Sequence, residues 1–107
     1  MSSPLQFLVE LIEDHTPIGV CGLLYRESID VTDVGFAILS PYRRRGYAYE
    51  AARAVMSYGQ VTLGIDRIVA LTSEENHASI RVLEKLGLSF EKIIKMSEDD
   101  PGTALFS

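Results

Sequence analysis

The sequence has little of what several classes of protein require. It has one cysteine in 107 residues, Cys21, so no disulfide can form within the chain, and the apolar neighbours of this cysteine predict a small buried core residue. Ten basic residues stand against fifteen acidic ones, and the net charge of −5 argues against a general nucleic-acid binder, which needs Lys and Arg to neutralise phosphates. Two histidines and no His/Cys cluster predict no metal site.

Long apolar runs are also missing. No stretch approaches the roughly 20 apolar residues that a membrane-spanning helix needs. The first four residues are not the basic start of a signal peptide, so we expect a cytoplasmic protein with no membrane partner. The length and the 47% hydrophobic composition fit a single domain over residues 1–107, with one core.

Apolar periodicity predicts eight elements in the order β-β-β-α-β-α-β-β. They are strands at residues 5–12, 18–26 and 34–39, a helix from about 48 to 63, a strand at 68–71, a helix from 76 to 87, and strands at 90–96 and 103–106. This order indicates an α+β single domain with a mixed sheet. The nearly continuous apolar run at 34–39 predicts a central strand covered on both faces. Small residues in the first helix, such as Ala52 and Gly59, predict close packing on the sheet.

A basic turn lies between the predicted central strand and the first helix. Arg43, Arg44 and Arg45 precede Gly46, and a helix that starts here has unpaired N–H groups in its first turn and roughly half a positive charge from its dipole. Glycine lets the backbone approach an anion, and guanidinium groups bind phosphate oxygens in pairs. A solvated turn is the alternative, but the position between strand and helix favours a diphosphate site.

The motif Arg43-x-x-Gly46-x-Ala48 resembles the Gln/Arg-x-x-Gly-x-Gly/Ala signature of the GNAT N-acetyltransferases. Residues 50–54 and 75–87 resemble the branch that acetylates the N-termini of ribosomal proteins, and the similarity extends over roughly residues 17–106. The resemblance implies the GNAT (acyl-CoA N-acyltransferase-like) fold and acetyl-CoA as cosubstrate. It also implies transfer of an acetyl group to a primary amine by direct attack in a ternary complex.

The resemblance also implies where the cofactor binds. The diphosphate would lie on Arg43, Arg44, Arg45, Gly46, Tyr47 and Ala48, called the cradle below. The pantetheine arm would pair with the backbone of Ala37, Ile38 and Leu39, where the central strand splays from its neighbour. Asn76 has two readings, as the N-cap of the last helix and as a hydrogen-bond partner of the cofactor.

Ser79 and Asp33 are the main candidates for proton transfer. Ser79 matches a hydroxyl that protonates the leaving thiolate in similar enzymes, whereas many members use a tyrosine at the position of Leu83, which has no proton to donate. Asp33 is placed just ahead of the central strand, where histone-type members carry the glutamate that acts as base, and a turn residue is the alternative. Glu74 and Glu75 are rival bases.

Typical GNAT domains begin with a strand and one or two helices that wall off the acceptor, and the resemblance starts near their second strand. Two functions therefore stay open: an active N-acetyltransferase, and a module that binds acetyl-CoA or another anion without catalysis. One side of the sheet should expose apolar surface, which predicts a homodimer or a fragment of a longer protein. A generic nucleotide binder is disfavoured because neither a P-loop nor a dinucleotide motif is present.

Overall fold

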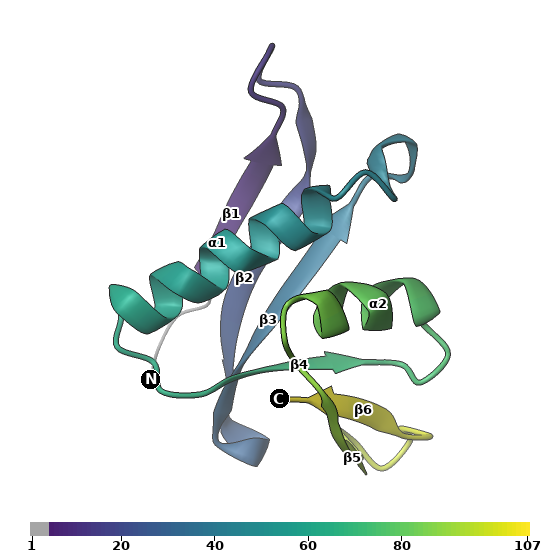
Figure 1. Ribbon diagram of the computed structural model, residues 1–107. Coiled ribbons are helices and arrows are strands. Elements are labelled where there is room, and N and C mark those ends of the chain that lie inside the picture. Colours follow the sequence, from purple (N-terminus) through teal and green to yellow (C-terminus); the bar gives the residue numbers. More distant parts are fainter. Residues whose placement is uncertain (1–4) are drawn as a thin grey trace.

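The computed structural model describes residues 5–107 and shows one six-stranded mixed sheet with two α-helices (Figure 1). The elements are β1 (Leu5–Glu10), β2 (Pro17–Arg26), the 3-10 turn η1 (Glu27–Ile29), β3 (Val31–Ile38), the 3-10 turn η2 (Ser40–Tyr42), α1 (Tyr47–Val61), β4 (Ile68–Thr72), α2 (His77–Lys85), β5 (Phe90–Ile94) and β6 (Thr103–Phe106). The order of strands and α-helices confirms the prediction. Neither helix in this part of the chain is long and apolar enough to cross a membrane.

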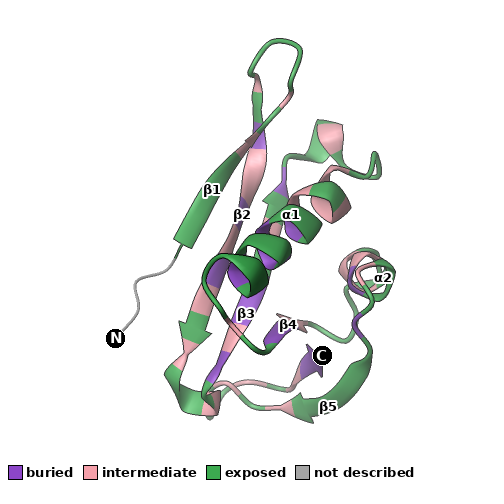
Figure 2. Ribbon diagram, turned by 60° about the vertical axis from the view of Figure 1, so that its left-hand side comes forward, coloured by how far each residue is buried: buried purple, intermediate pink, exposed green. Residues whose placement is uncertain are grey.

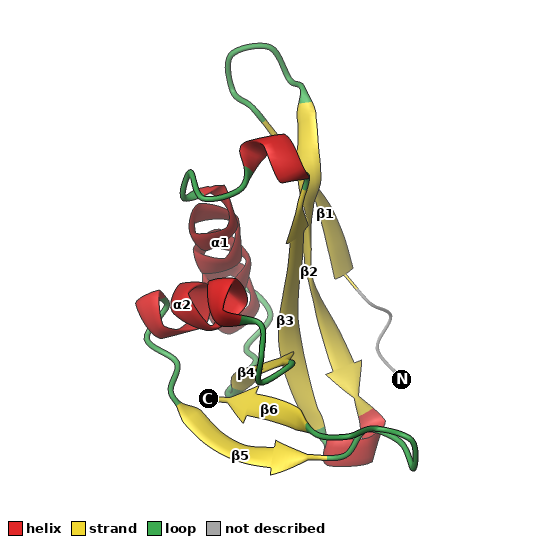
Figure 3. Ribbon diagram, turned by 90° about the vertical axis from the view of Figure 1, so that its right-hand side faces the viewer, coloured by secondary structure: helices red, strands yellow, loops and turns green. Residues whose placement is uncertain are grey.

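The strands lie in the order β1-β2-β3-β4-β6-β5, and only the β3–β4 pair is parallel. β3 is third in this order and therefore central, as predicted. The prediction that residues 34–39 are covered on both faces is wrong. Figure 3 shows α1 and α2 on the same side of the sheet, and Gly35 and Ala37 are exposed on the other side. Apolar composition alone does not reveal on which face the two helices pack.

The main core lies between α1, α2 and the sheet. Gly59 lets α1 approach closely, because a Cβ atom at this position would come within 2.8 Å of the Leu23 side chain and 3.0 Å of Ile68. Ala52 is fully buried on the same helix face, which confirms the predicted close packing. Cys21 is buried in this core as predicted, and burial raises the pKa of its thiol to about 11, so the thiol is unreactive at neutral pH.

Several strand boundaries differ from the predicted ones, among them those of β1, β3 and β5, which ends at Ile94 rather than residue 96. β1 ends at Glu10 because the Leu11 amide donates to the carbonyl of Thr16 across the hairpin loop, and Ile12 is left exposed in that loop. β3 begins at Val31 rather than residue 34, because residues 31–34 continue the antiparallel pairing with β2. Asp33 is therefore inside the strand and not in the turn before it.

Candidate functional site

β3 and β4 separate toward their carboxyl ends. Their pairing consists of Thr32 with Ile68 and Asp33 with Val69, although β3 continues to Ile38. Within residues 5–107, the segment 34–38 of β3 therefore has no strand partner on the β4 side, and we call it the open edge. Because α1 follows β3 and α2 follows β4, both helices begin beside this divergence, as Figure 1 shows.

The register with β2 decides which backbone groups face the open edge. The amide of Leu39 donates to the carbonyl of Ile18 at 2.7 Å, so Leu39 directs its peptide groups toward β2. Peptide groups alternate in direction along a strand, and Ala37 therefore also faces β2, opposite Val20. Of the three residues predicted to pair with pantetheine, Ile38 is the one whose peptide groups face the open edge.

Phe36 shares this orientation with Ile38 and was not predicted as a site residue. Peptide groups alternate along a strand, so assigning Ile38 to the open edge would also have assigned Phe36, two residues earlier, to that edge. The Nε group of Arg43 donates to the Ile38 carbonyl at 2.9 Å, so the first arginine of the cradle contacts the open edge. The Ile38 amide and both peptide groups of Phe36 remain for a ligand.

The cradle holds a run of backbone amides without protein partners. Among residues 5–107, no acceptor is present for the amides of residues 44–49, and the first α1 amide to bond is that of Glu50, to the Gly46 carbonyl at 3.0 Å. No side chain caps the helix. Left-handed φ angles of 63° at Arg44 and 83° at Gly46 curve the backbone here, and bends of this kind form anion-binding concavities.

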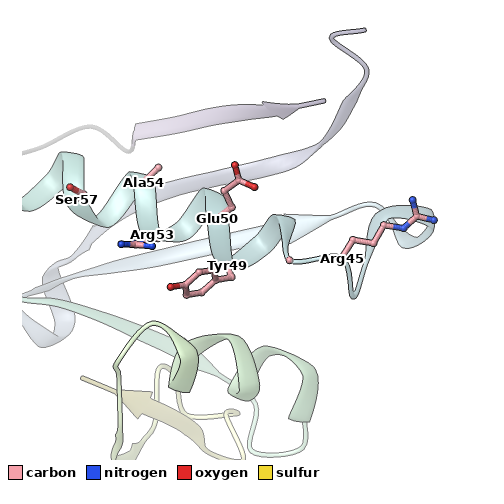
Figure 4. A pocket seen from close by; sticks show the side chains of 7 residues that line it. Arg45, Tyr49, Glu50, Arg53, Ala54 and Ser57 are labelled. Carbon is pink, nitrogen blue, oxygen red and sulfur yellow. The ribbon is translucent and has the colours of Figure 1, made fainter. Parts of the chain in front are cut away.

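The charges around these amides are positive. The three arginines of the triplet are exposed, and none is within 4 Å of a carboxylate in the described part of the chain. Arg45 and Gly46 line one end of an open hollow of about 600 Å³ that continues along α1 (Figure 4). Amides, helix dipole and guanidinium groups thus converge at one place, which is the chemistry that a diphosphate requires. The binding of a ligand there stays a prediction.

Asn76 caps α2, as one of its two readings predicts. Its Oδ1 atom accepts a hydrogen bond from the Ser79 amide at 3.2 Å. The Nδ2 group is not used for the cap, and the second reading, a bond to the cofactor, stays a prediction. The half-buried Ser79 lies in the first turn of α2, and its hydroxyl is not needed for the cap. Leu83 is 2% exposed in the core, so neither its chemistry nor its position suits a proton donor.

Asp33 lies at the other end of β3 from the cradle. It is five residues before Ile38, which corresponds to about 16 Å along a strand. Its carboxylate is 7% exposed and forms an ion pair with Nε of Arg26. Both residues alternate with Val34 and Leu23, which pack in the core with the helices, so the pair lies on the opposite sheet face. Glu74 and Glu75 follow the carboxyl end of β4 and lie on the same loop as the start of α2. The geometry therefore separates Asp33 from Ser79, and its role as base stays a prediction.

Replacing Asp33 by Asn tests whether this carboxylate is structural. Arg26 is 38% exposed, so solvent screens the pair and we expect the Asp33→Asn variant to lose about 1 kcal/mol of unfolding free energy rather than the 3–5 of a fully buried pair. Urea unfolding measures this loss, with the exposed Asp66→Asn as a control that should change stability little. A variant as stable as the wild type but with a much lower turnover would instead identify Asp33 as the base.

Comparison with known proteins agrees with this architecture. The model of the acetyltransferase (GNAT) domain matches residues 2–89. YkkB, an uncharacterized protein of Bacillus subtilis, is 36% identical over 80 residues, which are 73% of this chain but 46% of YkkB, so the chain spans less than half the length of this relative.

Solved structures share the fold. A GNAT-family acetyltransferase of Bacillus anthracis matches 94% of this chain and 63% of its own at a TM-score of 0.82 and 28% identity. A putative ribosomal-protein-serine acetyltransferase of Vibrio cholerae matches 97% of this chain and 63% of its own at a TM-score of 0.81, but at 19% identity it shows the fold alone. With the family model covering most of its length, this chain belongs to the GNAT acetyltransferase family.

Proposed function

We propose that the chain binds acetyl-CoA and transfers its acetyl group to a primary amine. The observation that carries this proposal is the run of six unpaired amides at residues 44–49, which opens α1 beside the carboxyl end of β3. An uncapped helix start leaves four amides free, here those of residues 46–49, and the turn before it adds two more. Edged by three arginines, these amides suit the two phosphates of coenzyme A. Membership of the GNAT family supports acetyl-CoA as the cosubstrate.

The described residues suit direct transfer. With the diphosphate on the cradle, the amides of Ile38 and Phe36 can pair with the pantetheine arm and direct the thioester toward the start of α2. The neutral amine attacks the thioester carbon, the carbon–sulfur bond breaks, and the leaving thiolate takes a proton. Ser79 supplies that proton in this proposal, because its hydroxyl lies in the first turn of α2 and is not used by the cap.

The acceptor we propose is a protein N-terminus or a small amine, in the manner of the ribosomal-protein branch. Support comes from the segment Asn76-x-x-Ser79 and its flanks, which resemble that branch. A thiol-release assay with acetyl-CoA over a panel of amines and N-terminal peptides tests the choice. Preference for peptides over polyamines supports a protein N-terminus as the acceptor, whereas the reverse preference supports a small amine and contradicts the ribosomal-protein branch.

The alternative function is a module that binds acetyl-CoA without catalysis. The buried Leu83 at the position of the usual tyrosine and the coverage of 46% of YkkB favour it. Calorimetry with acetyl-CoA followed by the thiol-release assay separates the two. Binding with turnover establishes the enzyme, binding without turnover on every acceptor establishes the module, and no binding contradicts both.

We also propose that two copies associate through the outer edge of β1. In residues 5–107 no strand pairs with this edge, and its side chains Leu5, Phe7 and Leu8 are exposed, Leu8 by 60% (Figure 2). The opposite edge of the sheet, β5, carries Glu91 and Lys92 and a bulge, which are features that discourage pairing. The unprotected β1 edge is therefore the one suited to a second strand.

Light scattering coupled to gel filtration at micromolar concentration should show a dimer. Leu8→Lys places a charge on the β1 edge and is expected to give a monomer with an unchanged core. Ile93→Lys, a matched change of a 41% exposed side chain on β5, should leave the dimer intact. A wild-type protein that elutes as a monodisperse monomer contradicts this association.

A further inference from the structure

A second, smaller hollow lies between α2 and the β5–β6 hairpin, where α2 covers the end of the sheet (Figure 1). Its volume is about 220 Å³. Four apolar and two acidic side chains line it: Glu74, Ile80, Glu84, Phe90, Ala104 and Phe106. None of the described residues of β3, α1 or the cradle is part of this lining, so the hollow is separate from the proposed acetyl-CoA site.

A bulge in β5 places two large apolar side chains on the face that carries this hollow. Phe90 is opposite Phe106 in the register of the two strands. Ile93 is opposite Ala104, and cross-strand partners direct their side chains to the same face. Phe90 and Ile93 are three residues apart, which would put them on opposite faces of a regular strand. The register shift between Phe90 and Lys92 restores a common face, and Phe90 is 56% exposed there. The hollow therefore continues into an exposed apolar strip along β5.

The two carboxylates beside the hollow have no ion-pair partner in the described chain. No Lys, Arg or His nitrogen of residues 5–107 lies within 4 Å of Glu74 or Glu84. Two neighbouring lysines are directed elsewhere. Nζ of Lys85 lies 4.9 Å from the centre of the Tyr49 ring on α1, and Lys92 is opposite Leu105, which faces the other side of the sheet. Unpaired carboxylates beside an apolar hollow suit a group that joins cations to an apolar side chain.

The size of the hollow favours one anchor side chain of a larger partner over a free small ligand. Sites for small molecules usually have volumes of roughly 300–1,000 Å³ and enclose most of the ligand. This hollow has about 220 Å³ and lies at the edge strand of the sheet. Protein interfaces obtain most of their binding energy from a few large side chains that fill hollows of this kind. Because Glu91, Lys92 and the bulge discourage strand addition at β5, a partner would lie across the face.

We propose that the hollow and Ile93, together called the β5 surface, dock a basic segment of another protein. One aromatic or large aliphatic side chain of that segment fills the hollow, and flanking Lys or Arg side chains pair with Glu74 and Glu84. Glu74, a rival base by its place in the sequence, thereby has a role in binding. The inference does not depend on acetyl transfer, because the β5 surface shares no residue with the cradle or the open edge.

The test titrates the full chain with three peptides and follows the backbone amides by NMR spectroscopy. The peptides are acetyl-Arg-Phe-Arg-amide, acetyl-Glu-Phe-Glu-amide and acetyl-Arg-Gly-Arg-amide, and their blocked ends leave no primary amine to act as an acceptor. The first should bind at least about tenfold more tightly than either of the others, because it alone supplies both the ring and the cations. The chemical-shift changes should concentrate on α2, β5 and β6.

Two double variants separate the carboxylates of the β5 surface from general charge. Glu74→Gln/Glu84→Gln changes two exposed side chains and should remove most of the advantage of the Arg-Phe-Arg peptide over the Glu-Phe-Glu peptide. Glu13→Gln/Glu98→Gln removes the same charge from two exposed loop positions and should keep that advantage.

The inference is overturned if the three peptides bind equally or not at all, if the chemical shifts change on other elements, or if the advantage survives in Glu74→Gln/Glu84→Gln. It is also overturned if Ile93→Lys dissociates a dimer in light scattering, because the β5 surface would then belong to a second copy of the chain. Selective binding of the Arg-Phe-Arg peptide that is lost in Glu74→Gln/Glu84→Gln and kept in Glu13→Gln/Glu98→Gln establishes the docking surface.

Discussion

Gly46→Asp is expected to weaken acetyl-CoA binding by about 100-fold or more. A side chain at Gly46 meets nothing within 4 Å, so the new carboxylate would stand in the open space before the unpaired amides. It would accept their hydrogen bonds itself and repel the diphosphate, and the loss of one or two charge-assisted hydrogen bonds corresponds to a change of that size. Isothermal calorimetry with acetyl-CoA measures it.

Gly64→Asp is the matched control for backbone strain. Gly64 has a φ of +68°, close to the +83° of Gly46, and a side chain there also meets nothing within 4 Å. It follows the other end of α1, so the same change adds the same charge and similar strain far from the cradle. We expect Gly64→Asp to lose at least as much stability as Gly46→Asp, because its carboxylate stands at the negative end of the helix dipole, and to keep an unchanged affinity. If both variants lose affinity equally, strain is the cause and the cradle is not the binding site.

Ser79→Ala is expected to lower kcat by about 100-fold while leaving acetyl-CoA affinity unchanged. A positioned general acid contributes roughly 10²–10⁴ to a rate, and alanine removes the hydroxyl that would protonate the thiolate. The cap of α2 survives, because Asn76 bonds to the backbone amide of Ser79 and not to its side chain. Steady-state thiol release measures kcat, and calorimetry with acetyl-CoA measures the affinity. The stability of the variant is measured in parallel.

The control is Ser97→Ala, which removes an exposed hydroxyl from the loop between β5 and β6. Its kcat should equal that of the wild type. An unchanged kcat in Ser79→Ala would remove Ser79 from the chemistry and leave the thiolate to be protonated by another group. Leu83 cannot be that group, since it is buried and carries no proton donor.

Much of the fold could be predicted because local patterns specify it. Small residues at helical spacing place α1 close on the sheet, where a Cβ atom at Gly59 would collide with the side chains of Leu23 and Ile68. Asn76 at the start of an amphipathic segment predicts the cap that is observed. The glycines after the helices, Gly64 and Gly87, adopt the left-handed φ that ends a helix. Each of these features depends on neighbours close in sequence or on residue size.

What the sequence could not predict depends on contacts between distant segments. The peptide groups of Ala37 and Leu39 face β2 because of the register between β2 and β3. The apolar periodicity of one segment does not determine that register. The hydrogen bond from Arg43 to the Ile38 carbonyl arises only once η2 folds back beside β3. The placement of both helices on one face of the sheet, which leaves Gly35 exposed, likewise depends on how the distant segments are connected in space.

The sequence predicted the location and chemical type of the candidate site, but not its backbone geometry. The arginines and Gly46 mark the cradle from composition and position, but the left-handed φ of Arg44 is visible only in the structure. The four-residue spacing of Tyr49 and Arg53 within α1 is present in the sequence and indicates a common helix side. The contact between Lys85 of α2 and the Tyr49 ring requires the tertiary packing of two helices.

The most direct test of the account is amide-resolved NMR spectroscopy during a titration with acetyl-CoA. The backbone amides of residues 44–49 are unpaired within the described chain, so the account predicts that they show the largest chemical-shift changes as each gains a phosphate acceptor. Binding that leaves these six amides unmoved, with the changes concentrated on other elements, would contradict it.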